Sequence, residues 1–316
     1  MNTKKAYACY NLNEDVRSDS TSGGVFSLLA EYVICKKNGV VFGAVFDDNY
    51  DVIHTRAEDM NDVCKMRGSK YSQSNINDAF IKVKQDLECG RWVLFTGTPC
   101  QVYALRSYLG DSYDNLVTMD FVCHGVASPA IWREYLQSVV KGNIKSVRFK
   151  DKAKGWKTWY VKIEHDNKVF YQRGRMNKFM KSYLQYANIR PSCYECRFKG
   201  DNRKSDFTIS DCWGIGENDK EINDNRGLSA LILNTDKSLG IFEEIKSSLA
   251  YKEYDKDVLM EGNWTYYRSV TRNPSREDFF YTWKTKGINR ALNKYFAPRM
   301  KGWFYYIFLK LKGIER

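Results

Sequence analysis

The chain has 316 residues, of which 43% are hydrophobic and 28% charged, as in soluble globular proteins with one large or two modest domains. No apolar run is long enough to span a bilayer, and the N-terminal residues lack the apolar core of a signal peptide, so we expect a cytoplasmic protein without a transmembrane segment. The net charge is +12, and residues 141–204 alone carry 18 Lys and Arg against 5 Asp and Glu, which predicts an anionic partner or a solvated basic face.

Three kinds of anionic partner suit this basic stretch. They are nucleic acid, an acidic electron carrier and an anionic small-molecule substrate, such as a phosphorylated one. The chain has no zinc-finger, RNP-type or helix-turn-helix pattern, so we expect no nucleic-acid partner.

The N-terminal part of the chain predicts strands and helices in alternation. We expect strands over residues 5–10, 40–47 and 52–56, which are rich in β-branched and aromatic residues. Between the first two strands, Ser22 is followed by two glycines and then by apolar residues at helical spacing, which predicts a helix with Ser22 as its N-cap. Free backbone N–H groups at a helix start bind anions, although a Ser-Gly-Gly sequence is more often only a turn.

A five-residue segment follows the next expected helix. It consists of Arg67, Gly68, Ser69, Lys70 and Tyr71, and it combines two cations, a hydroxyl group and an aromatic ring. This mixture suits a phosphate group and a stacked ring, and it suits an exposed turn equally well. The residues alone leave both interpretations open.

Two expected strands, over residues 92–96 and 116–122, each end just before a cysteine. Cys100 follows the first strand at the start of a helix, and Cys123 follows the second, before His124. The alternation of strands and helices over the first 140 residues predicts an α/β layer with parallel strands, in which ligands bind beyond the carboxyl ends of the strands. We therefore expect the two thiols to share one edge of the sheet.

The chain changes character after residue 140. Three segments within residues 144–172 alternate apolar with charged residues and predict a small antiparallel β insertion. Further strands are expected over residues 206–214 and 228–233, followed by a helical C-terminal region. The expected fold class is α/β, with a mostly parallel or mixed sheet and flanking helices.

We divide the chain into three regions on this basis. Residues 1–140 form an α/β core, residues 141–235 form the β insertion and a cysteine-pair segment that completes the core, and residues 236–316 form the helical region. The last region ends in a basic, aromatic tail that suits peripheral contact with a membrane surface, or packing against this chain or a partner. Its large apolar residues are Trp303, Phe304, Tyr305, Tyr306, Phe308 and Leu311.

Nine cysteines are spread over the chain, a pattern that favours metal or redox use over a disulfide framework. Cys193 and Cys196 form a C-x-x-C pair, which directs two sulfurs the same way, and Cys100 and Cys123 stand in turns at strand ends. We expect the fold to gather these four around one metal centre, for which zinc and iron–sulfur are alternatives on spacing alone. Cys212 ranks lower as a ligand. Most of the remaining four are expected to be small buried side chains: Cys9, Cys35, Cys64 and Cys89.

Seven short motifs occur in order along the chain, over residues 5 to about 235. They are Ser22-Gly23-Gly24-Val25-Phe26-Ser27, Val41-Phe42-Gly43-Ala44, Arg67-Gly68-Ser69-Lys70-Tyr71, Gly97-Thr98-Pro99-Cys100-Gln101, Cys123-His124-Gly125-Val126, Cys193-Tyr194-Glu195-Cys196 and Asp211-Cys212-Trp213-Gly214-Ile215. Together they resemble the beta-subunit family of coenzyme F420 hydrogenases and dehydrogenases. A bacterial subset of this family, tied to surface-polysaccharide gene clusters, is similar to the chain.

The resemblance implies a flavoprotein in which residues 1–140 form the FAD-binding core, next to a 4Fe–4S cluster. By motif, the ligands of that cluster match Cys100, Cys123, Cys193 and Cys196. The positions that match flavin or cofactor contacts are Ser22, Gly23, Gly24, Arg67, Gly68, Ser69, Lys70, Tyr71, Thr96, Gly97 and Thr98. Family members move electrons between a flavin and a deazaflavin, a partner subunit, a ferredoxin or an organic substrate.

Two departures from the family pattern affect the expected function. The chain lacks the ferredoxin-like C-x-x-C-x-x-C-x-x-x-C-P segment with which many relatives begin, so we expect a separate electron donor, such as a ferredoxin or a partner subunit. Cys212 stands where an aromatic residue is expected, which predicts a variant environment for the cluster.

We therefore expect an iron–sulfur flavoprotein oxidoreductase that passes electrons between a 4Fe–4S cluster, FAD and an unknown substrate or deazaflavin-like cofactor, with a role in surface-polysaccharide biosynthesis. His124, beside a cluster ligand, is either a proton donor near the flavin or a hydrogen-bonded structural histidine. The alternative is a non-catalytic or zinc-binding scaffold of a glycan pathway, which the missing ferredoxin segment motivates.

Overall fold

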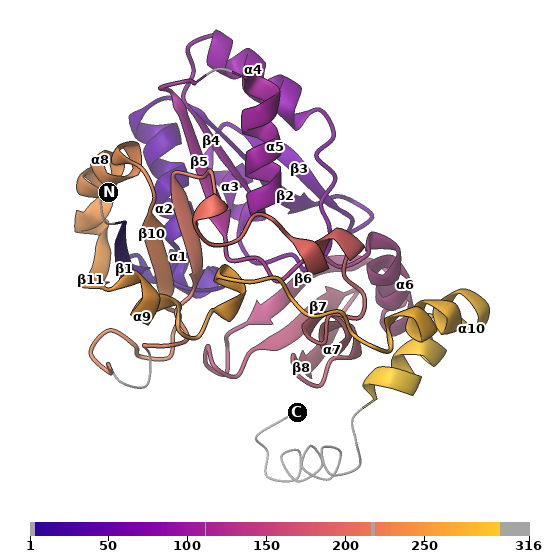
Figure 1. Cartoon of the computed structure of the whole chain (residues 1–316). Helices are drawn as coiled ribbons and strands as arrows, with labels where there is room; N and C mark the ends of the chain where they lie inside the picture. Colours follow the sequence, from indigo (N-terminus) through magenta and orange to yellow (C-terminus); the bar gives the residue numbers. More distant parts are fainter. Residues whose placement is uncertain (1–3, 111, 216–218, 298–316) are drawn as a thin grey trace.

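The computed structural model describes residues 4–110, 112–215 and 219–297, which form two β-sheets with helices packed on their faces (Figure 1). The large sheet has eight strands in the order β11-β1-β10-β9-β5-β4-β2-β3, and the small sheet has the order β6-β7-β8. The large sheet consists of β1 (Lys5–Asn11), β2 (Val40–Phe46), β3 (Val52–Ala57), β4 (Val93–Gly97), β5 (Leu116–Phe121), β9 (Phe207–Asp211), β10 (Ser229–Leu233) and β11 (Leu249–Tyr254). The small sheet consists of β6 (Ile144–Asp151), β7 (Tyr160–His165) and β8 (Lys168–Arg173).

Four adjacent strands of the large sheet run parallel. β2 pairs with β4, β4 with β5, and β5 with β9, all in the same direction. The outer pairs, β2 with β3, β9 with β10, and β1 with both β10 and β11, are antiparallel. Because parallel strands end at the same edge, the turns after β4, β5 and β9 are neighbours at the carboxyl edge of the sheet. The prediction of a mixed sheet in an α/β fold is confirmed.

One face of the large sheet is covered by α2 (Val25–Glu31), α3 (Met60–Met66) and α8 (Asp236–Ile245). Their apolar side chains share one buried core with the strands, including Leu28 of α2, Leu94 of β4 and Phe242 of α8. Buried side chains of this size each contribute roughly 1.5–3 kcal/mol to the stability of the fold. This core holds α2 and α3, and therefore the segments that precede and follow them, in fixed positions.

The opposite face of the large sheet is covered in two parts. α4 (Ala79–Glu88) and α5 (Pro99–Leu109) pack on β2, β4 and β5, and α9 (Lys256–Met260) packs near β1 and β10. α5 starts directly after β4, because Pro99 occupies its first turn and Gln101 Oε1 accepts a hydrogen bond from Thr98 N at 2.9 Å. This start fixes the position of Cys100 at the carboxyl edge.

The small sheet packs against α6 (Pro129–Val139), α7 (Lys178–Leu184) and α10 (Arg276–Phe296), at the lower right of Figure 1. Its strands are antiparallel, as the alternating sequence predicted. Aromatic rings fill the core between them: the ring of Trp132 lies 4.8 Å from that of Phe149 and 5.0 Å from that of Phe179. These tilted ring contacts stabilise the attachment of β6 to the helices.

Three local predictions differ from the structure. Residues for which no helix was predicted form the short helix α1 (Glu14–Asp19), capped by Asn13. β11 was not predicted, because its sequence LAYKEY contains charged residues and lacks a clear strand pattern. It is an edge strand of the large sheet, and its pairing with β1 defines it. Ser22 was wrongly expected to cap α2: the N-cap is Gly24, whose φ of 83° favours glycine, and the Ser22 hydroxyl hydrogen-bonds Asp211 instead.

The cysteines outside the candidate metal centre differ in exposure. Cys9 is buried, as predicted, and Cys212 is buried as well. The prediction of burial was wrong for Cys35, Cys64 and Cys89, which are exposed. Cys35 lies on η1 (Tyr32–Lys36), Cys64 on α3, and Cys89 at the end of α4. In each element nearby apolar side chains are buried and the cysteine is not.

The C-terminal tail that we expected to contact a membrane or to pack against this chain or a partner, with Trp303 and Phe308 among its residues, lies outside the described residues. In the part of the chain that the structure describes, no helix combines the length and the apolar composition that crossing a bilayer requires.

Candidate functional site

A cavity of about 910 Å³ lies where α1, the end of β2, the segment after α3 and β6 come together. This volume is typical of small-molecule and cofactor sites. Its lining includes nine Lys and Arg side chains against five Asp and Glu, which favours an anionic ligand. Phe46 and Tyr50 add aromatic surface to the wall, and the buried ring of Phe149 lies behind them. The cavity therefore offers both charge for an anion and a face for a planar ring.

The cation-rich segment after α3 forms part of this wall. Arg67 Nε donates a hydrogen bond to Ser27 Oγ at 2.9 Å, and Ser69 N donates one to Thr21 Oγ1 at 2.8 Å. These bonds tie the segment to the start of α2 and the turn before it. Four of its five residues line the cavity: Arg67, Gly68, Ser69 and Lys70.

Two lysines in the cavity wall have backbone carbonyls as the hydrogen-bond acceptors of their ammonium groups. Lys70 Nζ donates to Met66 O at 3.1 Å, Arg67 O at 3.0 Å and Gly68 O at 3.1 Å. Lys152 Nζ likewise donates to three carbonyl oxygens, at 2.7–3.0 Å, of Arg17, Ser22 and Arg226. Burial lowers the pKa of Lys70 to about 7, and burial together with the charge of Arg17 lowers the pKa of Lys152 to about 8.

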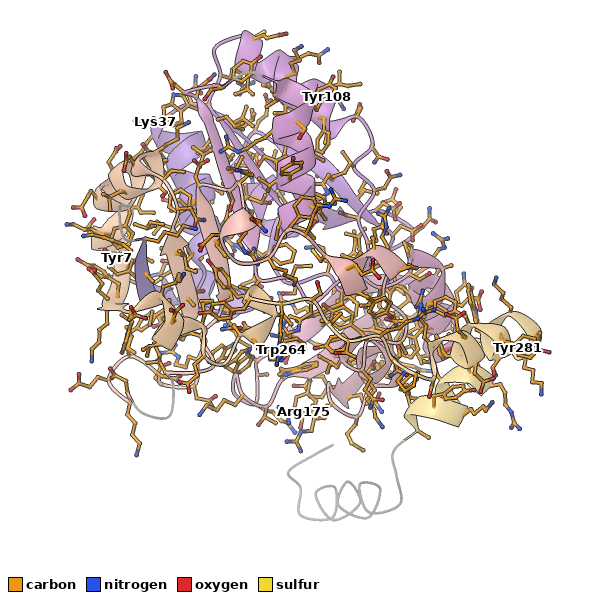
Figure 2. The ribbon with its side chains drawn as sticks, in the orientation of Figure 1. Tyr7, Lys37, Tyr108, Arg175, Trp264 and Tyr281 are labelled. Atoms are coloured by element: carbon orange, nitrogen blue, oxygen red, sulfur yellow. The ribbon has the colours of Figure 1, made fainter. Side chains whose placement is uncertain are left out.

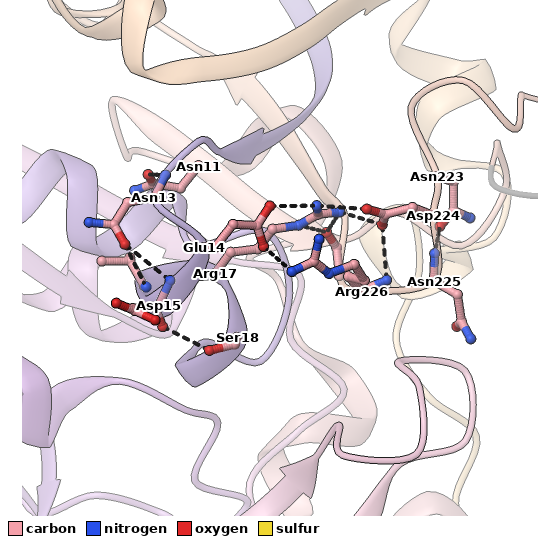
Figure 3. A network of polar contacts seen from close by, with 12 residues as sticks. Asn11, Asn13, Glu14, Asp15, Arg17, Ser18, Asn223, Asp224, Asn225 and Arg226 are labelled. Carbon is pink, nitrogen blue, oxygen red and sulfur yellow. Dashed lines mark hydrogen bonds and ion pairs between the residues drawn. The ribbon is translucent and has the colours of Figure 1, made fainter.

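Arg17 fixes the outer wall of the cavity. Its guanidinium group extends from α1 to Asp224, with Nη2 2.6 Å from Asp224 Oδ1, and its Nε donates to Gly227 O at 3.0 Å (Figure 3). The group also lies 3.5 Å above the ring of Tyr10, and the residue is only 1% exposed. Arg226 pairs with Glu14 in the same network. Two segments some 200 residues apart in sequence are thereby held together, with the cavity beside them.

Lys150 of β6, which lines the cavity, forms an ion pair with Asp211 at the end of β9. Burial alone lowers the pKa of Lys150, but Asp211 and Tyr71 raise it above its ordinary value. Ser22 donates its hydroxyl hydrogen to the same carboxylate. Ser22, Gly23 and Gly24 thus lie next to the cavity without lining it, and Gly23 N donates to Ser229 Oγ at 2.9 Å.

The structure brings the four candidate ligand cysteines into one neighbourhood. Burial raises the pKa of Cys123 to about 12, and thiolate charge on Cys193 and Cys100 adds to this effect. Charge on Cys100 and Cys196 likewise adds to burial in raising the pKa of Cys193. Charge effects of this kind fall with distance, so the turns after β4 and β5 and the C-x-x-C segment lie close together. Cys100 is exposed and the other three are partly buried.

Gly125 allows the turn after β5 to approach the cysteine pair. Its φ is 102°, a conformation that favours glycine. A Cβ atom at this position would lie 3.2 Å from Cys193 Cβ and 3.0 Å from Ile189 Cδ1. The Gly125 N–H donates to Cys123 Sγ at 3.3 Å, so this residue both makes room for Cys193 and binds a neighbouring sulfur.

The four side chains fit the chemistry of an iron–sulfur cluster, which cysteine thiolates bind. Within residues 4–110, 112–215 and 219–297, no three His, Cys, Asp or Glu side chains are grouped so that they could hold a metal ion. Sulfurs bound to different irons of a cluster lie further apart than sulfurs that surround one zinc ion. Four cysteine thiols are also a donor set that zinc accepts, so the side chains fit either centre.

Thr96, Gly97 and Thr98 lie at the end of β4 and do not line the cavity. Thr98 Oγ1 lies 3.0 Å from Cys100 Sγ, so this segment supports the cysteine. His124 lies with its ring edge-on to Trp264, at 6.4 Å between centroids, and its Nδ1 is 3.4 Å from Tyr186 Oη. Burial and the charges of Lys199 and Lys150 lower the pKa of His124 to about 4.

Comparison with known families decides the assignment of the chain. Residues 90–257, more than half of the sequence, match the family described as the C terminus of the coenzyme F420 hydrogenase/dehydrogenase beta subunit. The chain belongs to this family. The resemblance that the seven motifs carry is thus confirmed. No curated protein matches the chain.

A solved structure has a fold similar to that of this family member. It is described as the xenon derivatization of the F420-reducing NiFe hydrogenase complex from Methanosarcina barkeri. The two chains share 14% sequence identity with a TM-score of 0.54, over 92% of this chain and 91% of the other. At this identity the likeness concerns the fold alone.

Several wall residues of this beta-subunit family chain were not predicted. Arg17 falls in a stretch for which no helix or strand was predicted, and its burial depends on Asp224, more than 200 residues away. Lys150 and Lys152 belong to the basic stretch that the sequence singled out, but their direction depends on how β6 packs. The other cations of the cavity that were not predicted are Lys65, Lys145, Arg148 and Arg226.

Two tyrosine rings connect the cavity of this family member with its cysteines. Phe149 lines the cavity, and its ring lies 5.5 Å from that of Tyr71. The ring of Tyr71 lies 4.9 Å from that of Tyr183, whose hydroxyl donates to Gly125 O at 3.1 Å. Tyr183 is buried and Tyr71 is partly buried, so this ring pair lies between the two sites.

Proposed function

We propose that this beta-subunit family member is an iron–sulfur flavoprotein oxidoreductase. In this proposal it passes electrons between a 4Fe–4S cluster at the four cysteines, FAD in the cavity and a substrate or deazaflavin-like cofactor. The observation that carries the proposal is the adjacency of the two sites, joined through Tyr71 and Tyr183 at 4.9 Å between ring centroids. A cationic, aromatic cavity next to a group of thiols is what an enzyme needs to hold two redox centres side by side.

The cavity residues divide into two roles in this proposal. Arg67, Lys70 and Lys152 attract the phosphates of the dinucleotide through their positive charge. The ammonium groups of Lys70 and Lys152 each donate to three backbone carbonyls, so these two lysines act by charge from the wall and not by direct hydrogen bonds. Phe46 and Tyr50, which are only partly buried, contact a planar ring through their aromatic faces. When bound, a flavin supplies the exchange of electron pairs with a substrate and of single electrons with a cluster.

The residues around the cysteines hold and tune the cluster in this proposal. Thr98 Oγ1 and Gly125 N–H lie within hydrogen-bonding distance of Cys100 and Cys123 sulfurs, at 3.0 and 3.3 Å. Lys199 Nζ donates to Cys123 O at 2.7 Å and adds positive charge beside the thiolates. Hydrogen bonds and positive charge near cluster sulfurs favour the reduced state. His124 is next in sequence to one ligand. Its pKa of about 4 leaves it neutral at pH 7, so in this proposal it is a structural histidine near Tyr186 and not a proton donor.

A separate protein supplies electrons in this proposal. The similar solved structure belongs, by its description, to a hydrogenase complex, which supports a partner subunit as donor. A ferredoxin is the other candidate. Both are proteins that exchange single electrons.

Anaerobic purification followed by reconstitution with iron, sulfide and FAD tests the proposed function. We expect stoichiometric iron, acid-labile sulfide and flavin, with visible absorption that dithionite bleaches. Colourless protein that contains zinc and no flavin would contradict it and would favour the zinc-binding scaffold.

A further inference from the structure

The surface beside the C-x-x-C pair is made of two segments that are distant in sequence. The first contains η2 (Pro191–Glu195) and η3 (Gly200–Asn202), and the second contains η5 (Trp264–Tyr266) and the stretch leading to α10. Lys199 Nζ donates to Thr265 O at 2.8 Å, and Ser269 Oγ donates to Cys196 O at 3.2 Å. Both segments cross the same side of the molecule in Figure 1. They therefore form one continuous face.

This face carries positive charge that no described carboxylate neutralises. Arg190, Arg197 and Arg268 are exposed, and among the described residues none of them forms an ion pair. Other exposed arginines are paired, for example Arg133 with Asp51 and Arg272 with Glu277. The cysteine segment has two acidic side chains: Asp201 pairs with Lys4, and Glu195 lies between Arg190 and Arg197.

Aromatic side chains are exposed between these charges. Trp264, labelled in Figure 2, is 36% exposed, and the guanidinium carbon of Arg268 lies 5.3 Å from its ring centroid. Tyr103, one turn after Cys100 on α5, is 43% exposed, and its ring lies 5.0 Å from that of Phe198. Arginine and aromatic residues are enriched at the centres of protein interfaces, where they contribute most of the binding energy.

The redox site that we propose lies directly beneath this face. Cys100 is exposed, and Cys193 and Cys196 are partly buried, so a centre that they hold is close to the surface. Electron transfer slows steeply with distance, so a partner must dock where the centre is nearest to solvent. The cavity opens between α1 and β6, which leaves the arginine face free for a partner while the cavity holds its own ligand.

We propose that the face formed by Arg190, Arg197, Arg268 and Trp264 is the docking surface for an acidic protein that carries single electrons. This inference rests on the proposed function, which it deepens by naming the partner's chemistry and position. In each encounter the carrier is oxidised by one electron and the cysteine-bound centre is reduced by that electron, with no bond formed or broken. Opposite charge steers such a carrier to the face and orients its exposed redox group toward the cysteines.

Stopped-flow reduction of the reconstituted protein by a reduced plant-type ferredoxin, a small acidic carrier, tests this proposal. We expect the second-order rate constant to fall steeply as ionic strength rises from 0.01 M to 0.15 M, because the screening length shortens from about 30 Å to about 8 Å. Charge reversal in Arg197→Glu or Arg268→Glu should lower the rate constant at low salt about tenfold, as expected for charges that control association. Arg290→Glu reverses an exposed arginine on α10 that pairs with no described carboxylate, away from the cysteines, and should leave the rate constant unchanged.

Dithionite separates failure of this proposal from failure of the proposed function. Dithionite is too small to need a docking face, so it should bleach the wild type and all three variants equally. Bleaching by dithionite, with a ferredoxin rate that neither salt nor Arg197→Glu changes, would overturn the docking surface and leave the proposed function standing. Protein that dithionite does not bleach would overturn the proposed function itself, and the docking surface with it.

Discussion

The rings of Tyr71 and Tyr183 lie 4.9 Å apart, and each contacts a different site. Tyr71 lies against Phe149 of the cavity wall, and the hydroxyl of Tyr183 donates to Gly125 O in the turn after Cys123. The two rings are packed directly against each other, so the distance between the two sites is set by packing. Substitutions of Tyr71 or Tyr183 should therefore affect both the cavity and the cysteine site. Substitutions within one site should affect that site alone.

Tyr183→Phe should destabilise the fold while preserving the ring contact. The substitution removes the hydroxyl that donates to Gly125 O at 3.1 Å and leaves that carbonyl without this donor, which costs about 1 kcal/mol. Urea unfolding of the reconstituted protein measures this loss. Tyr186→Phe is the matched control, because its hydroxyl is 3.4 Å from His124 Nδ1 and half-buried, and it should cost less. A larger loss for Tyr186→Phe would contradict the role given to Tyr183.

Gly125→Ala should impair the cysteine site beyond its effect on the backbone. At a φ of 102°, an alanine costs about 1–2 kcal/mol, and its Cβ would also press against Cys193 and Ile189. Gly110→Ala is matched, because Gly110 also has positive φ, 73°, but a Cβ atom there would have no described atom within 4 Å. We expect Gly125→Ala to unfold at lower urea than Gly110→Ala and to retain less iron after reconstitution. Equal unfolding and equal iron content would show that the approach to Cys193 is unimportant.

The sequence was sufficient to predict that Cys100 and Cys123 share one edge. Two apolar strands, each followed by a turn with a cysteine, predicted parallel neighbours, and β4 and β5 pair in that way. The antiparallel small sheet was also predictable, because alternating apolar and charged residues are a local signal. Both predictions rest on information contained within a few residues of each strand.

The cavity could not be predicted in the same way. Its wall joins Arg17 of α1 with Lys152 of the β6 region, and the bond from Lys152 to Arg17 O spans 135 residues. No local pattern encodes such a contact, since Arg17 lies in a polar stretch with a single buried side chain. The role of Ser22 was missed for the same reason. Its hydroxyl donates to Asp211, 189 residues away, instead of capping the adjacent helix.

FAD binding should take up protons at pH 7.5. Burial lowers the pKa of Lys70 to about 7, and burial with the charge of Arg17 lowers that of Lys152 to about 8, so at this pH each is only partly protonated. A phosphate beside them favours the charged forms and raises both pKa values, so binding draws protons from solution. Affinity should therefore fall as pH rises from 6 to 9.

Calorimetric titration with FAD in Tris and in HEPES measures this uptake, because the observed enthalpy then changes with the ionisation enthalpy of the buffer. Lys70→Gln should reduce the uptake. Lys65→Gln is the control, since Lys65 also lines the cavity but is exposed and paired with Asp62. Binding enthalpies that do not depend on the buffer would refute the assignment of phosphate to these lysines.

Arg203→Met should be among the most destabilising single substitutions. Arg203 and Asp120 form an ion pair at 3.0 Å with both side chains 0% exposed, and the guanidinium lies 5.0 Å above the ring of Tyr266. Removing one partner leaves a buried charge and costs about 3–5 kcal/mol, whereas Arg133→Met, which opens the exposed pair with Asp51, should cost about 1 kcal/mol or less.

The pH dependence of the Arg203→Met variant provides a second check. Burial raises the pKa of Asp120 above its ordinary value, and Arg203 opposes that shift. Without Arg203 the pKa rises further, so the folded state binds more protons than the unfolded state between the two pKa values. The unfolding free energy of the variant should therefore increase as pH is lowered from 8 to 5. A deficit that is constant with pH would mean that Asp120 is not left charged and unpaired.

Serine substitutions discriminate between ligand and structural cysteines. Cys100→Ser and Cys193→Ser should each lose cluster iron, because serine is a poor ligand for a cluster that thiolates hold. Cys35→Ser is the control, since Cys35 is exposed on η1, far along the chain from the carboxyl edge, and should retain wild-type iron. Iron and acid-labile sulfide are measured after identical anaerobic reconstitution, with circular dichroism to confirm that each variant is folded.

Flavin content in the same samples tests how independent the two sites are. The cavity wall contains none of the four candidate ligand cysteines, so Cys193→Ser should bind FAD while lacking iron. Loss of both cofactors in a folded variant would mean that the cluster, and not only the packing of Tyr71 on Tyr183, maintains the cavity. Equal iron in Cys100→Ser, Cys193→Ser and Cys35→Ser would refute the ligand assignment outright. It would mean that Cys100 and Cys193 do not bind the iron.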